Sequence, residues 1–84
     1  MNTTLFKLIR QHVADLLNAA APMLTPESQL LADVRLFVRP APTQAEFEHV
    51  IARMEEDGQI IRHRDVDEGM KLKLSEVGVA ELVK

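Results

Sequence analysis

The four prolines of this 84-residue chain all fall within its first half, and they divide that half into separate segments. A proline inside a helix removes a backbone hydrogen bond and clashes with the preceding turn, so helices end before a proline or begin with one. Pro22 therefore ends a first helix that we predict over residues 4–20. Pro26 stands at the first position of a second helix, predicted over residues 26–37. The last two prolines lie close together and require a loop before a third helix can begin.

The third helix, predicted over residues 44–57, has the clearest boundaries in the chain. Thr43 and Glu46 have the spacing of a reciprocal capping box, in which each side chain accepts a hydrogen bond from the backbone N–H of the other residue. Gly58 stands where a left-handed residue typically ends a helix. Apolar residues recur at helical spacing between these boundaries and predict the buried face: Phe47, Val50, Ile51 and Met54.

The first two helices carry apolar faces of different width. Thr3 or Thr4 is expected to cap the first helix, and Thr25 the second. In the first helix, we place Phe6 and Leu17 away from the centre of the apolar stripe, so the apolar arc covers close to half of the circumference. One core contact seldom needs that width, which indicates a second partner surface, such as another copy of the chain. The second helix is expected to bury Leu30, Leu31, Val34 and either Phe37 or Val38.

The remainder of the chain changes from helical to alternating patterning. Residues 59–74 predict a two-stranded hairpin with a turn at residues 67–69, which hold the only nearby glycine. In the second strand, apolar residues alternate with lysines and define an inner and an outer face. Ser75 then caps a short last helix, predicted over residues 76–83.

Composition and spacing argue against several kinds of chemistry. The chain has no cysteine, which removes disulfides, thiolate metal sites and thiol nucleophiles. Its three histidines fall on different predicted elements without a second ligand at metal-binding spacing, so we expect neither a metal nor a cofactor. No nucleophile stands beside a base, and we predict no catalytic residue and no enzyme activity. Charges interrupt the apolar residues near the N-terminus, so we expect no signal peptide, no membrane span and a cytoplasmic location.

The order helix, helix, helix, hairpin and short helix, in a single domain, resembles a winged helix-turn-helix domain of the kind found in bacterial transcription regulators. Three stretches carry the resemblance, and together they cover about residues 24–82. They are Leu24-Thr25-Pro26 followed by Leu30 or Leu31, then Phe47, Val50, Met54, Gly58, Ile60 and Arg62, and finally Leu74-Ser75, Gly78 and Leu82. The resemblance implies an α+β fold of three helices, a two-stranded β-hairpin wing and a short C-terminal helix.

The resemblance also implies a surface for double-stranded DNA, in which the third helix faces base edges and the wing contacts phosphates or the minor groove. Side chains with suitable donors on or beside the third helix are Thr43, Gln44, His49 and Arg53. The wing supplies five closely spaced basic residues, namely Arg62, His63, Arg64, Lys71 and Lys73. Two other interpretations stay open. In the first, the outer face of the third helix contacts solvent or a protein. In the second, the wing is an ordinary charged hairpin that neighbouring acidic residues partly neutralise.

An acidic charge balance favours a second function for the same fold. The chain carries 10 Lys and Arg against 13 Asp and Glu, a net charge of −3. Residues 43–58 alone hold one basic and five acidic side chains, a local charge of −4 that would repel phosphates. The alternative to a nucleic-acid-binding regulator is therefore a protein-interaction or dimerisation module. Its partner surface is predicted to include Phe6, Leu17, Ala45 and Ala52.

Overall fold

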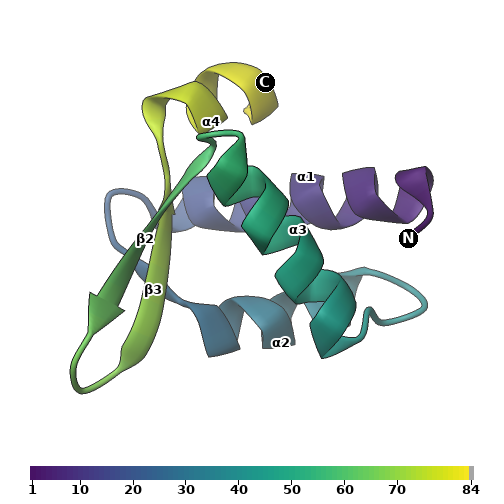
Figure 1. Cartoon of the computed structure of the whole chain (residues 1–84), viewed down its shortest axis with the longest axis horizontal. Helices are drawn as coiled ribbons and strands as arrows, with labels where there is room; N and C mark the ends of the chain where they lie inside the picture. Colours follow the sequence, from purple (N-terminus) through teal and green to yellow (C-terminus); the bar gives the residue numbers. More distant parts are fainter. Residues whose placement is uncertain (84) are drawn as a thin grey trace.

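A computed structural model describes residues 1–83 of the chain, which form an α+β fold as predicted (Figure 1). The four helices expected from the sequence are present, whereas the antiparallel sheet has three strands instead of two. In chain order the elements are α1 (Thr3–Ala20), β1 (Thr25–Pro26), α2 (Glu27–Phe37), α3 (Gln44–Glu56), β2 (Ile60–Asp65), β3 (Gly69–Leu74) and α4 (Glu76–Leu82).

Helix α1 lies against most of the other elements and contacts α2, α3, α4 and β3 (Figure 1). Its buried face consists of Ile9, Val13, Ala14 and Leu17, which recur at helical spacing. Leu17 is 1% exposed, so the prediction that it belongs to a partner surface is wrong. The physical reason is its register, because Leu17 lies one turn beyond Val13 and therefore on the same face of the helix.

Helix α3 ends within one residue of its predicted boundary and carries both predicted end signals. The Thr43 hydroxyl accepts a hydrogen bond from the Glu46 N–H at 3.1 Å, and the Glu46 carboxylate accepts one from the Thr43 N–H at 2.9 Å. At the other end, Gly58 has a φ of +73°, and the following N–H of Gln59 donates to the Met54 carbonyl oxygen at 2.8 Å. The four residues of the predicted apolar stripe are all buried. The third helix and its orientation are thus encoded locally.

The first two helices begin differently from prediction. Asn2 caps α1, because its side-chain oxygen accepts a hydrogen bond from the Thr4 N–H at 2.7 Å. Helix α2 begins without a side-chain cap, since Thr25 lies in strand β1. At the end of α2, Val38 is buried and Phe37 is exposed, which decides between the two residues left open above.

The sheet has the order β1-β3-β2, so that β3 is its central strand. Strands β2 and β3 form the predicted hairpin, with Ile60 paired to Leu74 at its base. The additional strand β1 pairs Thr25 with Leu72. Its second residue, Pro26, has no N–H to donate, which suits a short edge strand. Two residues are too few to show an alternating pattern, and for this reason the sequence did not predict β1.

Helix α4 packs closely against the residue that precedes β2. A Cβ atom added at Gly78 would lie 2.0 Å from the carbonyl oxygen of Gln59, so no side chain fits there. Ser75 caps the helix as predicted, with its hydroxyl accepting from the Gly78 N–H at 3.0 Å. The Gln11 amide of α1 donates to the Leu82 carbonyl oxygen at 2.9 Å and fixes the end of α4.

We expect the variant Gly78→Ala to lower the free energy of unfolding by about 2 kcal/mol, the size typical of overpacking. Alanine ordinarily stabilises a helix relative to glycine, so steric conflict with Gln59 would have to reverse the usual sign. Urea denaturation followed by circular dichroism measures the change. Val79→Ala, at an exposed site on the same helix, should stay within about 0.5 kcal/mol of the wild type. A Gly78→Ala protein that is as stable as the wild type would contradict the close approach.

Candidate interaction surfaces

The five basic residues of the hairpin do not form one patch, because strand pairing divides them between the two faces of the sheet. Residues that lie opposite each other in antiparallel strands point to the same side. Arg62 lies opposite the buried Leu72, and Arg64 lies opposite Met70, so both arginines belong to the inner face. The alternation places three basic residues on the outer face: His63, Lys71 and Lys73.

Arg62, on β2, forms ion pairs with two carboxylates, one on α2 and one on α3. Its guanidinium lies 3.6 Å from the Glu27 carboxylate at the start of α2 and 3.3 Å from the Glu55 carboxylate near the end of α3. The Arg62 side chain is only 26% exposed. Because its charge is compensated and it is largely covered, Arg62 is poorly placed to contact a phosphate.

The hairpin turn forms around the carboxylate of Asp65. This carboxylate accepts hydrogen bonds from the backbone N–H groups of Asp67 at 2.8 Å and Glu68 at 3.1 Å. The two bonds lower the pKa of Asp65, and the charges of Lys71 and His63 act in the same direction. Contact with the Glu68 carboxylate raises the pKa of Lys71. Among residues 1–83, the basic hairpin residues that form no ion pair are His63, Arg64 and Lys73.

The polar side chains predicted to contact nucleic acid from α3 are exposed, but most have partners within the chain. Thr43 is part of the capping box. The Gln44 amide donates to the Glu48 carboxylate at 3.1 Å, and the Arg53 guanidinium lies 3.4 Å from the Asp57 carboxylate. Exposed pairs of this kind contribute little to stability, so an external partner could replace them at small cost.

A small pocket of 240 Å³ between α1 and α3 brings together Phe6, His49 and Arg53. The Phe6 ring meets the His49 ring edge-on, with centroids 6.1 Å apart. Arg10, which the sequence did not indicate, also lines this pocket, and its guanidinium lies 5.4 Å from the Phe6 ring centroid. Two guanidinium groups in one pocket favour the binding of an anion. Asp57 also lines the pocket, and its carboxylate pairs with Arg53. We call this hollow the α1–α3 pocket.

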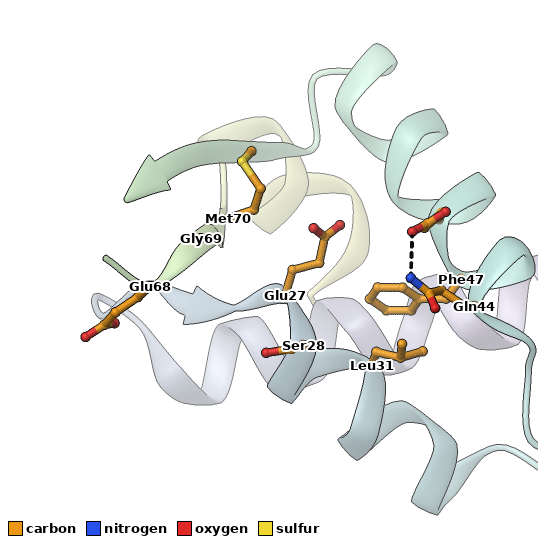
Figure 2. Close-up of a pocket in the computed structure, with 9 residues that line it drawn as sticks. Glu27, Ser28, Leu31, Gln44, Phe47, Glu68, Gly69 and Met70 are labelled. Carbon is orange, nitrogen blue, oxygen red and sulfur yellow. Dashed lines mark hydrogen bonds between the residues drawn. The ribbon is translucent and has the colours of Figure 1, made fainter. Parts of the chain in front are cut away.

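A larger groove of 430 Å³ lies between α2, α3 and the tip of the hairpin (Figure 2). Its carboxylates come from three elements, and the described residues that line it include no lysine, arginine or histidine. The carboxylates belong to Glu27, Glu48 and Glu68, and the apolar lining comes from Leu31, Phe47 and Met70. We call this hollow the acidic groove.

The carboxylates of the acidic groove differ in their surroundings. Figure 2 shows Leu31 and Phe47 side by side, with the Glu27 side chain reaching into the space between α3 and the hairpin. Glu27 is paired with Arg62, whereas Glu68 points away from the groove and contacts Lys71. Glu48 accepts a hydrogen bond from Gln44 and has no cationic partner within residues 1–83. Glu48 is therefore the carboxylate best placed to bind an external cation.

The predicted partner surface is only partly assembled by the fold. Phe6 is half-buried in the α1–α3 pocket, and Ala45 and Ala52 are exposed on α3. The acidic groove was not predicted, because its walls come from segments that are far apart in the chain. The available sequence signal was the pair Phe47 and Glu48, an inward apolar residue followed by an outward acid.

Metal-ligating side chains are not clustered in the described residues. Residues 1–83 contain no group of three or more histidine, aspartate or glutamate side chains that could hold a metal ion. Ser75 uses its hydroxyl to cap α4 and to donate to the Gly58 carbonyl oxygen, which is a structural role. None of the four described helices combines the length and apolar character that crossing a membrane requires.

The variant Asp65→Asn should change how stability depends on pH. Because the fold lowers the pKa of Asp65 below its ordinary value of 3.8, the ionised carboxylate stabilises the folded state above that pH. This contribution disappears as the pH falls through the folded-state pKa. Asparagine keeps an acceptor oxygen but no charge, so the variant should be less stable near neutral pH and approach the wild type in acid. Urea midpoints measured from about pH 6 to about pH 2 test this, and parallel profiles would contradict it.

Comparisons of the sequence with models of known protein families and with curated proteins, and of the fold with solved structures, find no match.

Proposed function

We propose that the chain is a winged-helix-type, non-catalytic protein-interaction module that binds a basic, amphipathic segment in the acidic groove. The observation that carries the proposal is the lining of this groove, which combines apolar side chains with the carboxylate of Glu48, the one lining glutamate without a cationic partner within residues 1–83. A segment with apolar side chains on one side and lysine or arginine on the other matches both features. The apolar side chains would contact the apolar side of the segment, and the charges would supply orientation and specificity.

The apolar floor is suited to such a segment. Phe47 is 1% exposed and belongs to the core, so it forms a rigid wall. Leu31 and Met70 are half-buried and still present apolar surface, and methionine adapts readily to different neighbours. Glu48 stands at the rim without a cation. These contacts are complementary to a cationic helix or strand and unfavourable for a phosphate backbone.

The fluorescence anisotropy of a labelled, helix-forming Lys/Leu peptide tests the proposal, with an acidic peptide of the same apolar pattern as the probe control. Glu48→Lys should weaken binding by about tenfold, because it places a like charge against the peptide. Glu56→Lys is the matched control, since Glu56 is exposed on the same helix but does not line the groove. The proposal is wrong if the basic peptide fails to bind at low ionic strength, or if both variants weaken peptide binding equally.

A second candidate function, nucleic-acid binding, is favoured by the α1–α3 pocket. Arg10, His49 and Arg53 meet there beside an aromatic ring, away from the acidic groove. Guanidinium groups are well suited to phosphate, and the pocket lies beside the outer face of α3. Duplex DNA would then contact α1 and α3 more than the hairpin.

For this second function, the double variant Arg10→Glu with Arg53→Glu should abolish DNA binding at moderate salt. Lys73→Glu, on the outer face of the hairpin, should have a smaller effect. A titration of duplex DNA at several salt concentrations gives both the affinity and the salt dependence, and the arginine variant should flatten the salt slope. Absence of binding by the wild type at low ionic strength would remove this function.

A further inference from the structure

We infer that the occupant of the acidic groove is a second copy of this chain, with the α2 helices of the two copies packed antiparallel about a two-fold axis. This inference rests on the protein-interaction function proposed above and names its partner. It places the exposed end of α2 from each copy in the groove of the other.

The end of α2 presents apolar side chains to solvent. Leu36 is 64% exposed and Phe37 is 60% exposed, although each belongs to a regular helix whose opposite face lies in the core. Phe37 is held in place by stacking on the His12 ring of α1, with centroids 6.0 Å apart. A large apolar pair held on a rigid helix end is the kind of surface that fills an apolar groove at an interface.

The charges around these residues complement the groove. Arg35 and Arg39 flank the exposed apolar pair, and neither forms an ion pair within residues 1–83. The Arg35 guanidinium donates to the Pro42 carbonyl oxygen at 2.9 Å, which fixes its position. In the groove, Glu48 also has no cationic partner. The end of α2 is therefore a basic, amphipathic segment of the chemistry that the groove favours.

The position of both surfaces along one helix explains why two copies fit together. Ser28 lines the groove at the start of α2, and Leu36 lies eight residues later, about 12 Å along the axis. Ser28, Ala32 and Leu36 are spaced four apart, so they lie along one side of the helix, and all three are exposed. Two α2 helices that run antiparallel and cross near Ala32 bring Leu36 of each copy to the groove of the other.

This arrangement closes on itself. Each copy gives one helix end and receives one, and the same surface is used on both sides of the axis, so a dimer forms without further addition. The N-terminal end of each helix, with Glu27, lies beside the basic C-terminal end of the other, which helix dipoles also favour. Figure 1 shows that α2 lies at the edge of the fold opposite α4, where a second copy can approach.

Sedimentation velocity and light scattering test the inference through two variants that disable opposite halves of the contact. Leu36→Glu removes the apolar residue that enters the groove, and Glu48→Lys alters the groove. Each variant alone should dimerise at least about tenfold more weakly than the wild type. An equal mixture should recover dimers, because one native contact re-forms and the altered pair, Glu at 36 with Lys at 48, attracts. Val77→Glu, at an exposed apolar position on α4, is the matched control and should dimerise normally.

The outcomes separate this inference from the proposed function. If the wild type is monomeric at the highest soluble concentration, or the mixture does not recover dimers, the second copy is not the occupant. The Lys/Leu peptide should bind Leu36→Glu at least as tightly as it binds the wild type, because that variant leaves the groove intact and removes the second copy that competes for it. A wild type that is monomeric yet binds the peptide would overturn the inference alone, whereas a wild type that neither dimerises nor binds the peptide would also overturn the proposed function. Circular dichroism of each variant checks that the substitution leaves the fold intact.

Discussion

Pairing along both edges of β3 is the constraint on which the rest of the structure depends. Leu72, at the centre of this strand, is fully buried and lies opposite Thr25 on one side and Arg62 on the other. This pairing fixes the start of α2 beside the hairpin, and only then can Glu27 reach Arg62. The acidic groove exists because β3 brings the start of α2, the hairpin tip and α3 together.

Charge compensation then shapes the surface that remains. Acidic residues at the end of a helix oppose its dipole, which makes the run from Glu55 to Asp57 at the end of α3 unfavourable in isolation. The fold gives two of these residues a cation, since Glu55 pairs with Arg62 and Asp57 with Arg53. The same pairs remove cations from surfaces that would meet a phosphate backbone. Ion pairs within the chain therefore favour a protein partner at the groove, while the α1–α3 pocket keeps its basic character through Arg10.

The features that could be predicted are those set by neighbours in sequence. The capping box of Thr43 and Glu46 and the left-handed Gly58 needed only spacing and residue type. The alternation along β3 likewise placed Leu72 inward and the lysines outward. The expectations that were wrong depend on contacts between distant segments or on exact helical register. Thr25 lies in a strand because it pairs with β3. Leu17 lies at the centre of the buried face of α1, and its position one turn after Val13 could have shown this.

By itself, the sequence determined the number and order of the helices, the hairpin and the inward faces of α3 and β3, because periodicity and end signals act over a few residues. Only the tertiary structure decided where charge remains available. Arg62 and Arg64 are two residues apart and basic in sequence, yet Arg62 is compensated by carboxylates from two helices and Arg64 is exposed. Electrostatic interactions act through space and depend on burial, so residues of one chemical type acquire different roles once the chain has folded.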